Sequence, residues 1–470
     1  MSDSLLAQGY SITDSTVRLP SAPELIRVLT LADYNTRVVM LGTMLLGCAA
    51  GIIGTFMLLR KRALMGDALS HATLPGIGLA FMIMVSLGGS GKYLPGLLLG
   101  AMVSGILGLA CVLANRNLTL LKEDAALGIV LSVFFGLGIA VLGLVQKMQQ
   151  GSAAGLESFI YGKTASMLAS DAYLIAAAAM VTTAACLLLF KEFATLCFDQ
   201  NYARTQGWPT LWLDVAMMAM VTLVTVIGLQ AVGLILMIAL LVIPPAAARF
   251  WTNHLPTMVF ASAGIGALSG FLGAGLSALV PRLPAGAIIV LVATGVFVIS
   301  MLLGPARGVL VRALEHVRMV RKVRRQHLLR AMFERTEPQT AGDPILAHTE
   351  PVSFGHILEQ RSWSPAALRR AIRSAMRGGL LRRASAQRFA LTRDGAAEAF
   401  RVVRNHRLWE LYLIHHADIA PSHVDREADE LEHVLGPAMV ASMETKLRAG
   451  YPDLAMPPSP HVLSRAEAVS

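Results

Sequence analysis

An acid and an imidazole stand one helical turn apart at the start of a long apolar stretch. Asp67 and His71 lie in LLRKRALMGDALSHATLPGIGLAFMIMV, a few residues after the three cations at 60–62. Residues at i and i+4 share one face of a helix. Ionisable side chains inside a membrane segment are costly and point to function, and a carboxylate with an imidazole suits a divalent first-row metal. The alternative is that the two side chains bond to each other and close a polar pocket.

A second set of metal-ligating residue types lies near the C-terminus. His406 and Glu410 are spaced i, i+4, and Asp429, Glu432 and His433 occupy one arc of a helix at i, i+3 and i+4. Two acids and a histidine in this pattern suit Mn(II) or Fe(II) once a second helix closes the site. Six of the twelve histidines fall in the last 70 residues.

Two regions of different polarity must position these residues. Only 15% of the 470 residues are charged, against about a quarter in soluble proteins. Residues 1–303 hold 15 Lys and Arg and 12 Asp and Glu, whereas residues 304–470 hold 25 and 18. We therefore expect an apolar membrane region followed by a polar, basic domain.

Apolar runs long enough to cross a bilayer recur through the first region. The sixth and seventh runs join through Gly228 and Gly233 and could form one span plus a half-helix, so eight or nine spans are expected. Recurrent glycine and alanine favour close helix packing. The predicted fold is an all-α polytopic membrane protein with a cytoplasmic, mainly α winged-helix domain. The runs are 38–59, 68–86, 94–114, 125–146, 171–190, 211–229, 231–248, 257–280 and 285–303.

Cations fall on alternate loops, which orients the chain. By the positive-inside rule, the loop at 60–62 and the Arg-rich run from Arg307 lie in the cytoplasm of a multi-pass protein of the cell (inner or plasma) membrane. The C-terminal domain is then cytoplasmic. Residues 23–36 suggest a short amphipathic helix on the membrane surface, so the side of the N-terminus stays open.

The region after the last span has a winged-helix pattern. A basic helix leaves the membrane beside lipid headgroups, a polar loop covers 336–344, and two helices and a two-stranded wing follow. The second of these helices is rich in arginine, as phosphate contacts require. A membrane-tethered domain reaches DNA poorly, however. We expect no nucleic-acid binding and assign the basic face to lipid or a partner ATPase.

The membrane region resembles the ABC-type manganese/zinc/iron permease family. The resemblance covers residues 35–308 and rests on the run around Asp67 and His71 and on three later stretches: FDQNYARTQG, GLQAVGLILMIALLVIPPAAARF and LPAGAIIVLVATGVFVISMLLGPARG. It implies a dimeric channel for Mn(II), Zn(II) or Fe(II), made with an identical or different second permease subunit. It also implies a separate ABC ATPase subunit and a solute-binding protein. Asp67 and His71 match positions on the family's metal path.

The stretch 198–207 resembles the family's coupling segment, which docks on the ATPase. As a short amphipathic helix, it would present Phe198 and Tyr202 to a groove on a partner, with Asp199 between them. The chain contains no G-x-x-x-x-G-K-[ST] motif. We therefore expect a transporter subunit that is not an enzyme, with ATP hydrolysed by another chain.

Residues 322–447 resemble iron- or manganese-dependent regulators of the diphtheria-toxin-repressor family. The motifs are VVRNHRLWELYLIHH and SHVDREADELEHVLGPAMVASMETKL. The resemblance implies that Glu432 and His433 are primary metal ligands and that His406 and Glu410 are ancillary ones. Asp429 falls where iron-type members have cysteine and manganese-type members have glutamate, which favours Mn(II). The alternative is a dimerisation fold that keeps only a vestige of the site.

Three smaller features complete the predictions. Pro244 and Pro245 should break a helix at the cytoplasmic end of a span. Glu123 and Asp124 should stabilise a helix N-terminus, with a metal exit site as the alternative. The four cysteines lack CxxC spacing and are interpreted as small buried hydrophobes.

These observations favour the membrane subunit of an ATP-driven Mn(II) importer, with Zn(II) or Fe(II) also possible, fused to a domain that senses metal. The alternatives are a membrane-tethered, metal-responsive transcriptional regulator and a secondary transporter that needs no ATPase. The expected segments are 1–36 (polar N-terminus and amphipathic helix), 37–308 (permease), 309–344 (basic linker and helix), 345–400 (winged helix-turn-helix), 401–450 (metal-binding and dimerisation helices) and 451–470 (tail).

Overall fold

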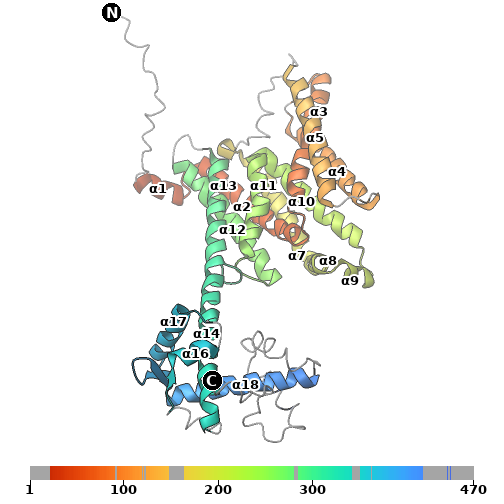
Figure 1. The fold of residues 1–470 in the computed structure, drawn as a ribbon. Helices are drawn as coiled ribbons and strands as arrows, with labels where there is room; N and C mark the ends of the chain where they lie inside the picture. The colour runs from red at the N-terminus through yellow and green to blue at the C-terminus, as the bar shows by residue number, and fades with distance from the viewer. Residues whose placement is uncertain are drawn as a thin grey trace, which may run out of the picture. The chain divides into compact units, whose positions relative to one another are not determined.

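The computed structural model describes residues 22–89, 91, 93–118, 120, 123–147, 164–279, 284–340, 350–360, 363–416, 442 and 445. It divides the chain into two compact units that meet between Arg312 and Ala313. Unit 1 is helical wherever it has regular structure, and unit 2 adds a small sheet to its helices (Figure 1).

The first helix of unit 1 is short and amphipathic, as expected, but it ends at Leu29 rather than at residue 36, because α2 already begins at Tyr34. The helices of unit 1 up to the last span follow one another along the chain. They are α1 (Ala22–Leu29), α2 (Tyr34–Leu59), α3 (Met65–Ser86), α4 (Leu94–Leu118), α5 (Glu123–Lys147), the 3₁₀ turn η2 (Thr164–Ser166), α7 (Ala169–Leu188), α8 (Phe190–Phe198), α9 (Gln200–Thr205), α10 (Thr210–Val232), α11 (Leu234–Ala248), α12 (Leu255–Leu279) and α13 (Ala285–Leu303).

Eight helices within the described residues are long and apolar enough to cross a membrane, and α11 is a shorter apolar helix. The sixth and seventh apolar runs therefore form one span plus a half-helix. Gly233 separates them with φ 85° and ψ 169°, a conformation that glycine adopts without a steric cost. Of the eight or nine membrane spans that the sequence predicts, the described residues contain eight.

Small residues let the helices of unit 1 cross at close range. A Cβ on Gly47 of α2 would lie 2.2 Å from the carbonyl oxygen of Gly266 on α12. A Cβ on Gly76 of α3 would lie 2.1 Å from that of Gly100 on α4. The Ser262 hydroxyl also donates to the Gly51 carbonyl at 2.7 Å. Close approach through glycine and serine is the packing mode expected inside a bilayer.

The predicted break at the double proline is wrong. Helix α11 continues through Pro244 and Pro245 to Ala248. Pro245 cannot donate to the Leu241 carbonyl four residues earlier. Gly54 of α2 packs against that carbonyl so closely that a Cβ would lie 2.3 Å from the oxygen. The helical hydrogen bond that Pro245 removes thus lies where α2 packs against α11. The φ angle that the proline ring fixes is compatible with a helix, so α11 continues.

Unit 2 is a winged helix, as predicted. Its elements are α14 (Val309–Thr340, which crosses the unit boundary), β1 (Val352–Ser353), α16 (Phe354–Gln360), α17 (Pro365–Arg377), β2 (Leu381–Arg383), β3 (Arg388–Leu391) and α18 (Arg393–His416). The antiparallel sheet has the order β1-β3-β2, with Val352 opposite Phe389 and Leu381 opposite Leu391. Strand β1 was not predicted because two residues carry no periodicity.

Two local details of unit 2 come from side-chain bonds. Ser364 caps α17 by accepting a bond from the Ala367 amide at 3.3 Å, as its place before Pro365 predicts. Helix α14 extends to Thr340 and replaces the first part of the loop expected at 336–344. Thr336 is buried and bonds back to the Phe333 carbonyl at 3.0 Å, and Glu337 pairs with Arg407 of α18.

Candidate functional site

Asp67 and His71 lie on one face of α3, two and six residues after its start at Met65. The Nε2 atom of His71 is 3.3 Å from Oδ1 of Asp67. Both side chains are largely covered: 17% of the His71 side-chain surface and 27% of that of Asp67 are exposed. The structure therefore brings the predicted pair into direct contact.

The two ring nitrogens of His71 have different surroundings. While Nε2 faces the Asp67 carboxylate, Nδ1 is buried and has no hydrogen-bond partner in the described structure. The edge of the Phe135 ring, on α5, packs against the imidazole with centroids 4.8 Å apart. An imidazole that donates one N–H to a carboxylate keeps the lone pair of its other nitrogen for a metal.

The pair has no third ligand within the described part of the chain. No group of three His, Cys, Asp or Glu side chains there is arranged to hold a metal. Glu123 and Asp124 begin α5, where acids favour a helix N-terminus.

The predicted coupling segment differs from expectation in one respect. Asp199 adopts an extended conformation (φ −147°, ψ 99°) and ends the helix, so Phe198 closes α8 and Tyr202 belongs to α9. The expected single amphipathic helix is therefore two helices. The Asp199 carboxylate accepts bonds from the Asn201 and Tyr202 amides, both at 2.9 Å, and so caps α9. Phe198 and Tyr202 remain 70% and 53% exposed.

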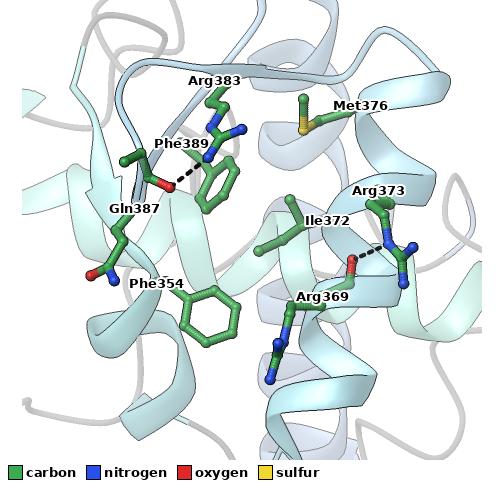
Figure 2. Close-up of a pocket in the computed structure, with 9 residues that line it drawn as sticks. Phe354, Arg369, Ile372, Arg373, Met376, Arg383, Gln387 and Phe389 are labelled. Carbon is green, nitrogen blue, oxygen red and sulfur yellow. Dashed lines mark hydrogen bonds between the residues drawn. The ribbon is translucent and has the colours of Figure 1, made fainter.

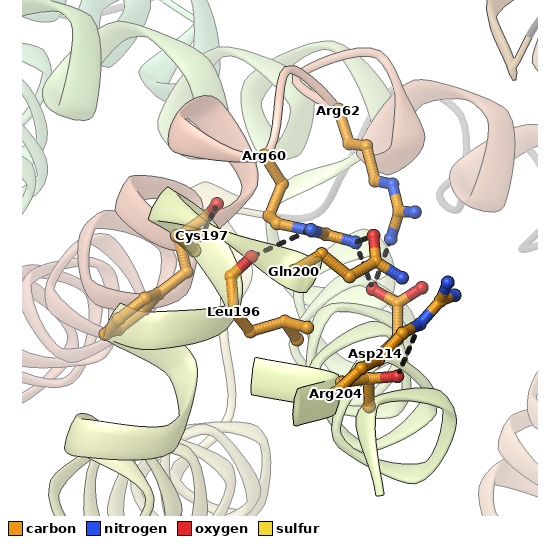
Figure 3. Close-up of polar contacts among 9 residues, drawn as sticks. Arg60, Arg62, Leu196, Cys197, Gln200, Arg204 and Asp214 are labelled. Carbon is orange, nitrogen blue, oxygen red and sulfur yellow. Dashed lines mark hydrogen bonds and ion pairs between the residues drawn. The ribbon is translucent and has the colours of Figure 1, made fainter. Parts of the chain in front are cut away.

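A buried ionic cluster joins this segment to α3, and sequence reasoning missed it. Arg60 and Arg62, between α2 and α3, pair with Asp214 of α10 at 3.3 and 2.5 Å. Figure 3 shows the two arginine side chains converging on this carboxylate. Arg60 also donates to the Leu196 carbonyl at 2.9 Å and to Gln200 at 3.3 Å. The side chains of Arg60, Arg62 and Asp214 are only 9%, 3% and 1% exposed. Asp214 thus ties the connector before Asp67 to α10, and Arg60 ties the same connector to α8 and α9.

Cys197 lies beside this cluster and is chemically quiet. Its thiol points to the Phe56 carbonyl at 3.7 Å, and burial raises its pKa to about 12. A thiol with so high a pKa stays protonated at neutral pH and packs as a small hydrophobe, as the sequence interpretation expected for this residue. Cys186 is buried as well, but Cys111 of α4 is exposed, so the interpretation is wrong there.

In unit 2 the described part of the predicted regulatory site is a buried polar network. Nε2 of His406 is 3.1 Å from Glu410, and Nδ1 is 3.1 Å from Nη1 of Arg330 on α14. Arginine can only donate, so Nδ1 accepts and Nε2–H donates to Glu410. A metal at His406 would have to replace one of these bonds. Asp429, Glu432 and His433 lie outside the described residues.

Unit 1 thus defines a multi-span helical membrane protein with a polar pair on an inner helix, and unit 2 is a winged helix. Residues 32–304 match the ABC 3 transport family, and residues 392–453 match the iron dependent repressor, metal binding and dimerisation domain. The chain belongs to the ABC 3 transport family.

The known proteins that are similar to this chain include two transport-system membrane proteins and one solved structure. The manganese transport system membrane protein MntC of Bacillus subtilis is 35% identical over 399 residues, which cover 85% of this chain and 88% of that protein. The zinc transport system membrane protein TroC of Treponema pallidum is 43% identical over 279 residues, covering 59% and 92%. The structure of PsaBC from Streptococcus pneumoniae in complex with Fab matches with a TM-score of 0.53 and 30% identity, covering 61% of this chain and 98% of that one.

The match to the Bacillus subtilis protein covers 399 residues of this chain, whereas unit 1 ends at Arg312. The match therefore includes part of unit 2. A fused C-terminal region is therefore shared with that relative.

Proposed function

We propose that this chain is the membrane-spanning subunit of an ATP-driven importer of a divalent transition metal, with Mn(II) as the favoured substrate. The observation that carries the proposal is the Asp67–His71 pair on α3, with Nδ1 of His71 unbonded in a chain of the ABC 3 transport family. The names of the two relatives support manganese or zinc. The test is ATP-driven metal uptake into proteoliposomes that hold this chain and its ATPase.

In this proposal His71 contacts the passing metal through Nδ1, and Asp67 orients the imidazole or joins as a ligand. Nδ1 is covered in the conformation described here, with Phe135 of α5 against the ring. A metal therefore reaches it only when α5 moves relative to α3. Such movement is what an alternating-access transporter requires, because the site must never open to both sides at once.

The partners follow from the same proposal. A separate ABC ATPase supplies energy, a second permease subunit completes the channel, and a solute-binding protein delivers metal. Unit 2 lies in the cytoplasm, on the side assigned by the cations at 60–62. The membrane-tethered regulator remains the alternative function, and it predicts no metal movement at all.

Removing the exposed aromatic groups of the coupling segment should uncouple the ATPase. With Phe198→Ala and Tyr202→Ala, we expect ATPase capture and uptake to fall about tenfold or more, because large desolvated aromatic side chains dominate interface energies. Both side chains are exposed, so folding should survive. Co-purification of the ATPase with the tagged chain is the measurement.

The matched control replaces two other exposed aromatics, Tyr34 and Tyr93, at helix ends remote from the 60–62 connector. They are 63% and 67% exposed, and their Ala variants should retain full capture. Unchanged capture and uptake in the Phe198/Tyr202 variant would make the segment a simple connection.

We also propose that cytoplasmic metal binds unit 2 and slows further import. The ligands would be Asp429, Glu432 and His433, helped by His406 and Glu410. The match of residues 392–453 to a metal-binding and dimerisation domain supports this. A tenfold preference for one transporter state corresponds to about 1.4 kcal/mol, within the usual range for allosteric coupling.

Disabling this second site should abolish the uptake plateau. With Glu432→Gln and His433→Ala, we expect the internal Mn(II) concentration to keep rising at times when it has levelled off in cells with the unaltered chain. Deletion of residues 322–470 should have the same effect. His461→Ala, which lies outside the motif, is the control and should keep the plateau. The measurement is the time course of cellular manganese at high supply. A plateau that persists in the double variant would mean that unit 2 only stabilises or dimerises the permease.

A further inference from the structure

A basic groove lies between α14 and α17 within unit 2. Its volume is about 650 Å³. Cationic and titratable side chains from both helices line it: His316, Arg321, Arg324, Arg370, Arg373 and Arg377. Pro365–Arg377 contains no acidic residue, so this flank of α17 contributes positive charge alone.

The five arginines of the groove have no ion-pair partner within the described residues. Other arginines of the unit do: Arg330 pairs with Glu334, Arg401 with Glu398 and Arg407 with Glu337. Five guanidinium groups around one groove repel one another, and an anion relieves that repulsion. Arginine also matches phosphate oxygens through its planar fork of N–H donors. A phosphate group is therefore the ligand chemistry that the groove fits.

The N-terminal part of α14 adds apolar surface beside these charges. Leu310, Leu314 and Val317 follow one another at helical spacing and are 47%, 57% and 43% exposed. Helix α14 begins at Val309, shortly after the membrane-spanning α13 ends at Leu303. At about 1.5 Å per residue, His316 and Arg324 lie about 10 and 23 Å from the start of α14. Exposed apolar residues followed by arginines are typical of helices at a lipid interface.

The groove on the wing side of α17 has a different character, and its volume is about 680 Å³. Figure 2 shows Phe354, Ile372, Met376 and Phe389 in this groove, with Arg383 near the upper end of the view and Arg369 near the lower end. Arg383 donates to the Ala386 carbonyl at 2.9 Å. A winged helix that reads DNA uses its recognition helix and wing. The α14–α17 groove shares Arg373 with the wing-side groove, and its other lining residues come from α14 and α17.

We infer that the α14–α17 groove binds the phosphate headgroup of an anionic phospholipid of the cytoplasmic leaflet. Free phosphate shares the chemistry, but it does not account for the exposed apolar side chains of α14 that lead to the groove. Lipid bound there would hold unit 2 at the membrane surface, through a contact that transport itself does not require.

The experiment is native mass spectrometry of the full chain, delipidated in detergent and titrated with phosphatidylglycerol or phosphatidylcholine. The groove variant carries Arg321→Gln, Arg324→Gln, Arg370→Gln and Arg377→Gln. The control variant loses equal charge at arginines that do not line this groove, with Arg369→Gln, Arg383→Gln, Arg388→Gln and Arg393→Gln. All eight arginines are exposed, so both variants should fold. A parallel arm replaces lipid with inorganic phosphate, and another with a DNA duplex.

The expected result is that the groove variant loses at least one phosphatidylglycerol site or weakens it about tenfold or more, while the control variant retains it. Phosphatidylcholine should show no difference between the variants. Equal phosphatidylglycerol binding by all three proteins would overturn the inference. The inference would also fail if inorganic phosphate alone bound as tightly as phosphatidylglycerol. Binding of duplex DNA that is lost in the groove variant would contradict it as well.

Discussion

Replacing Asp67 with Asn and His71 with Ala should abolish ATP-driven manganese uptake without lowering the amount of protein in the membrane. The two side chains contact each other at 3.3 Å and are partly exposed, so their loss leaves no buried charge behind. Asp67→Asn alone should reduce transport about 10- to 100-fold, the usual effect of removing the group that orients a metal-binding histidine. The measurement is manganese accumulation per molecule of complex.

His254→Ala is the matched control, because His254 is the other histidine of the membrane region and lies exposed in the turn before α12. It should transport like the unaltered chain. Normal uptake by the Asp67/His71 variant would remove the pair from the metal path and favour the structural alternative, a polar contact that closes a pocket.

Asp214→Asn should both destabilise the chain and uncouple it. Asp214 is 1% exposed and neutralises two buried arginines. Removing one partner of a buried ion pair costs about 3–5 kcal/mol, because the remaining charge stays uncompensated. The cluster also links the connector before α3 to α8 and α9. We therefore expect the folded complex to hydrolyse ATP yet move less metal for each ATP consumed.

Two measurements separate these effects. Thermal unfolding in detergent reports stability, and the ratio of metal moved to ATP hydrolysed, taken below the unfolding transition, reports coupling. Asp171→Asn is a useful control, since Asp171 also accepts a side-chain bond, from Gln230 at 3.2 Å, but lies at the start of α7. If Asp214→Asn left the ratio unchanged while lowering stability, the cluster would be structural only.

The spans and the winged helix were predictable because their signals are local. Long apolar runs and the Ser364–Pro365 cap need no partner to be recognised. Asp67 and His71 were predictable for the same reason, since an i, i+4 spacing places both on one face before any tertiary contact is known.

The Asp214 cluster was harder to predict because its partners lie more than 150 residues apart. The available signal was an acid at the start of an apolar run, in a chain with three clustered cations near another span. An ionisable residue there implies a partner. The sequence positions alone do not indicate which cation pairs with Asp214.

Two wrong predictions came from applying a local rule where tertiary contacts decide. The double proline was expected to end its helix, but α11 continues while α2 packs against the carbonyl that Pro245 leaves unbonded. The 198–207 segment was expected to be one helix from the spacing of Phe198 and Tyr202. Asp199 instead caps a new helix with its own side chain. Short polar side chains often bond to nearby backbone amides in this way, which favours ending one helix and starting another.

The most direct test of metal import by this chain is ATP-driven uptake by the reconstituted complex. Proteoliposomes should contain this chain, its second permease subunit and its ATPase, with the solute-binding protein supplied on the opposite side from ATP. We expect Mn(II) to leave the binding-protein side and to accumulate on the ATP side only when ATP is hydrolysed. Accumulation that proceeds equally without ATP hydrolysis, or no metal movement by a complex that binds both partners, would contradict it.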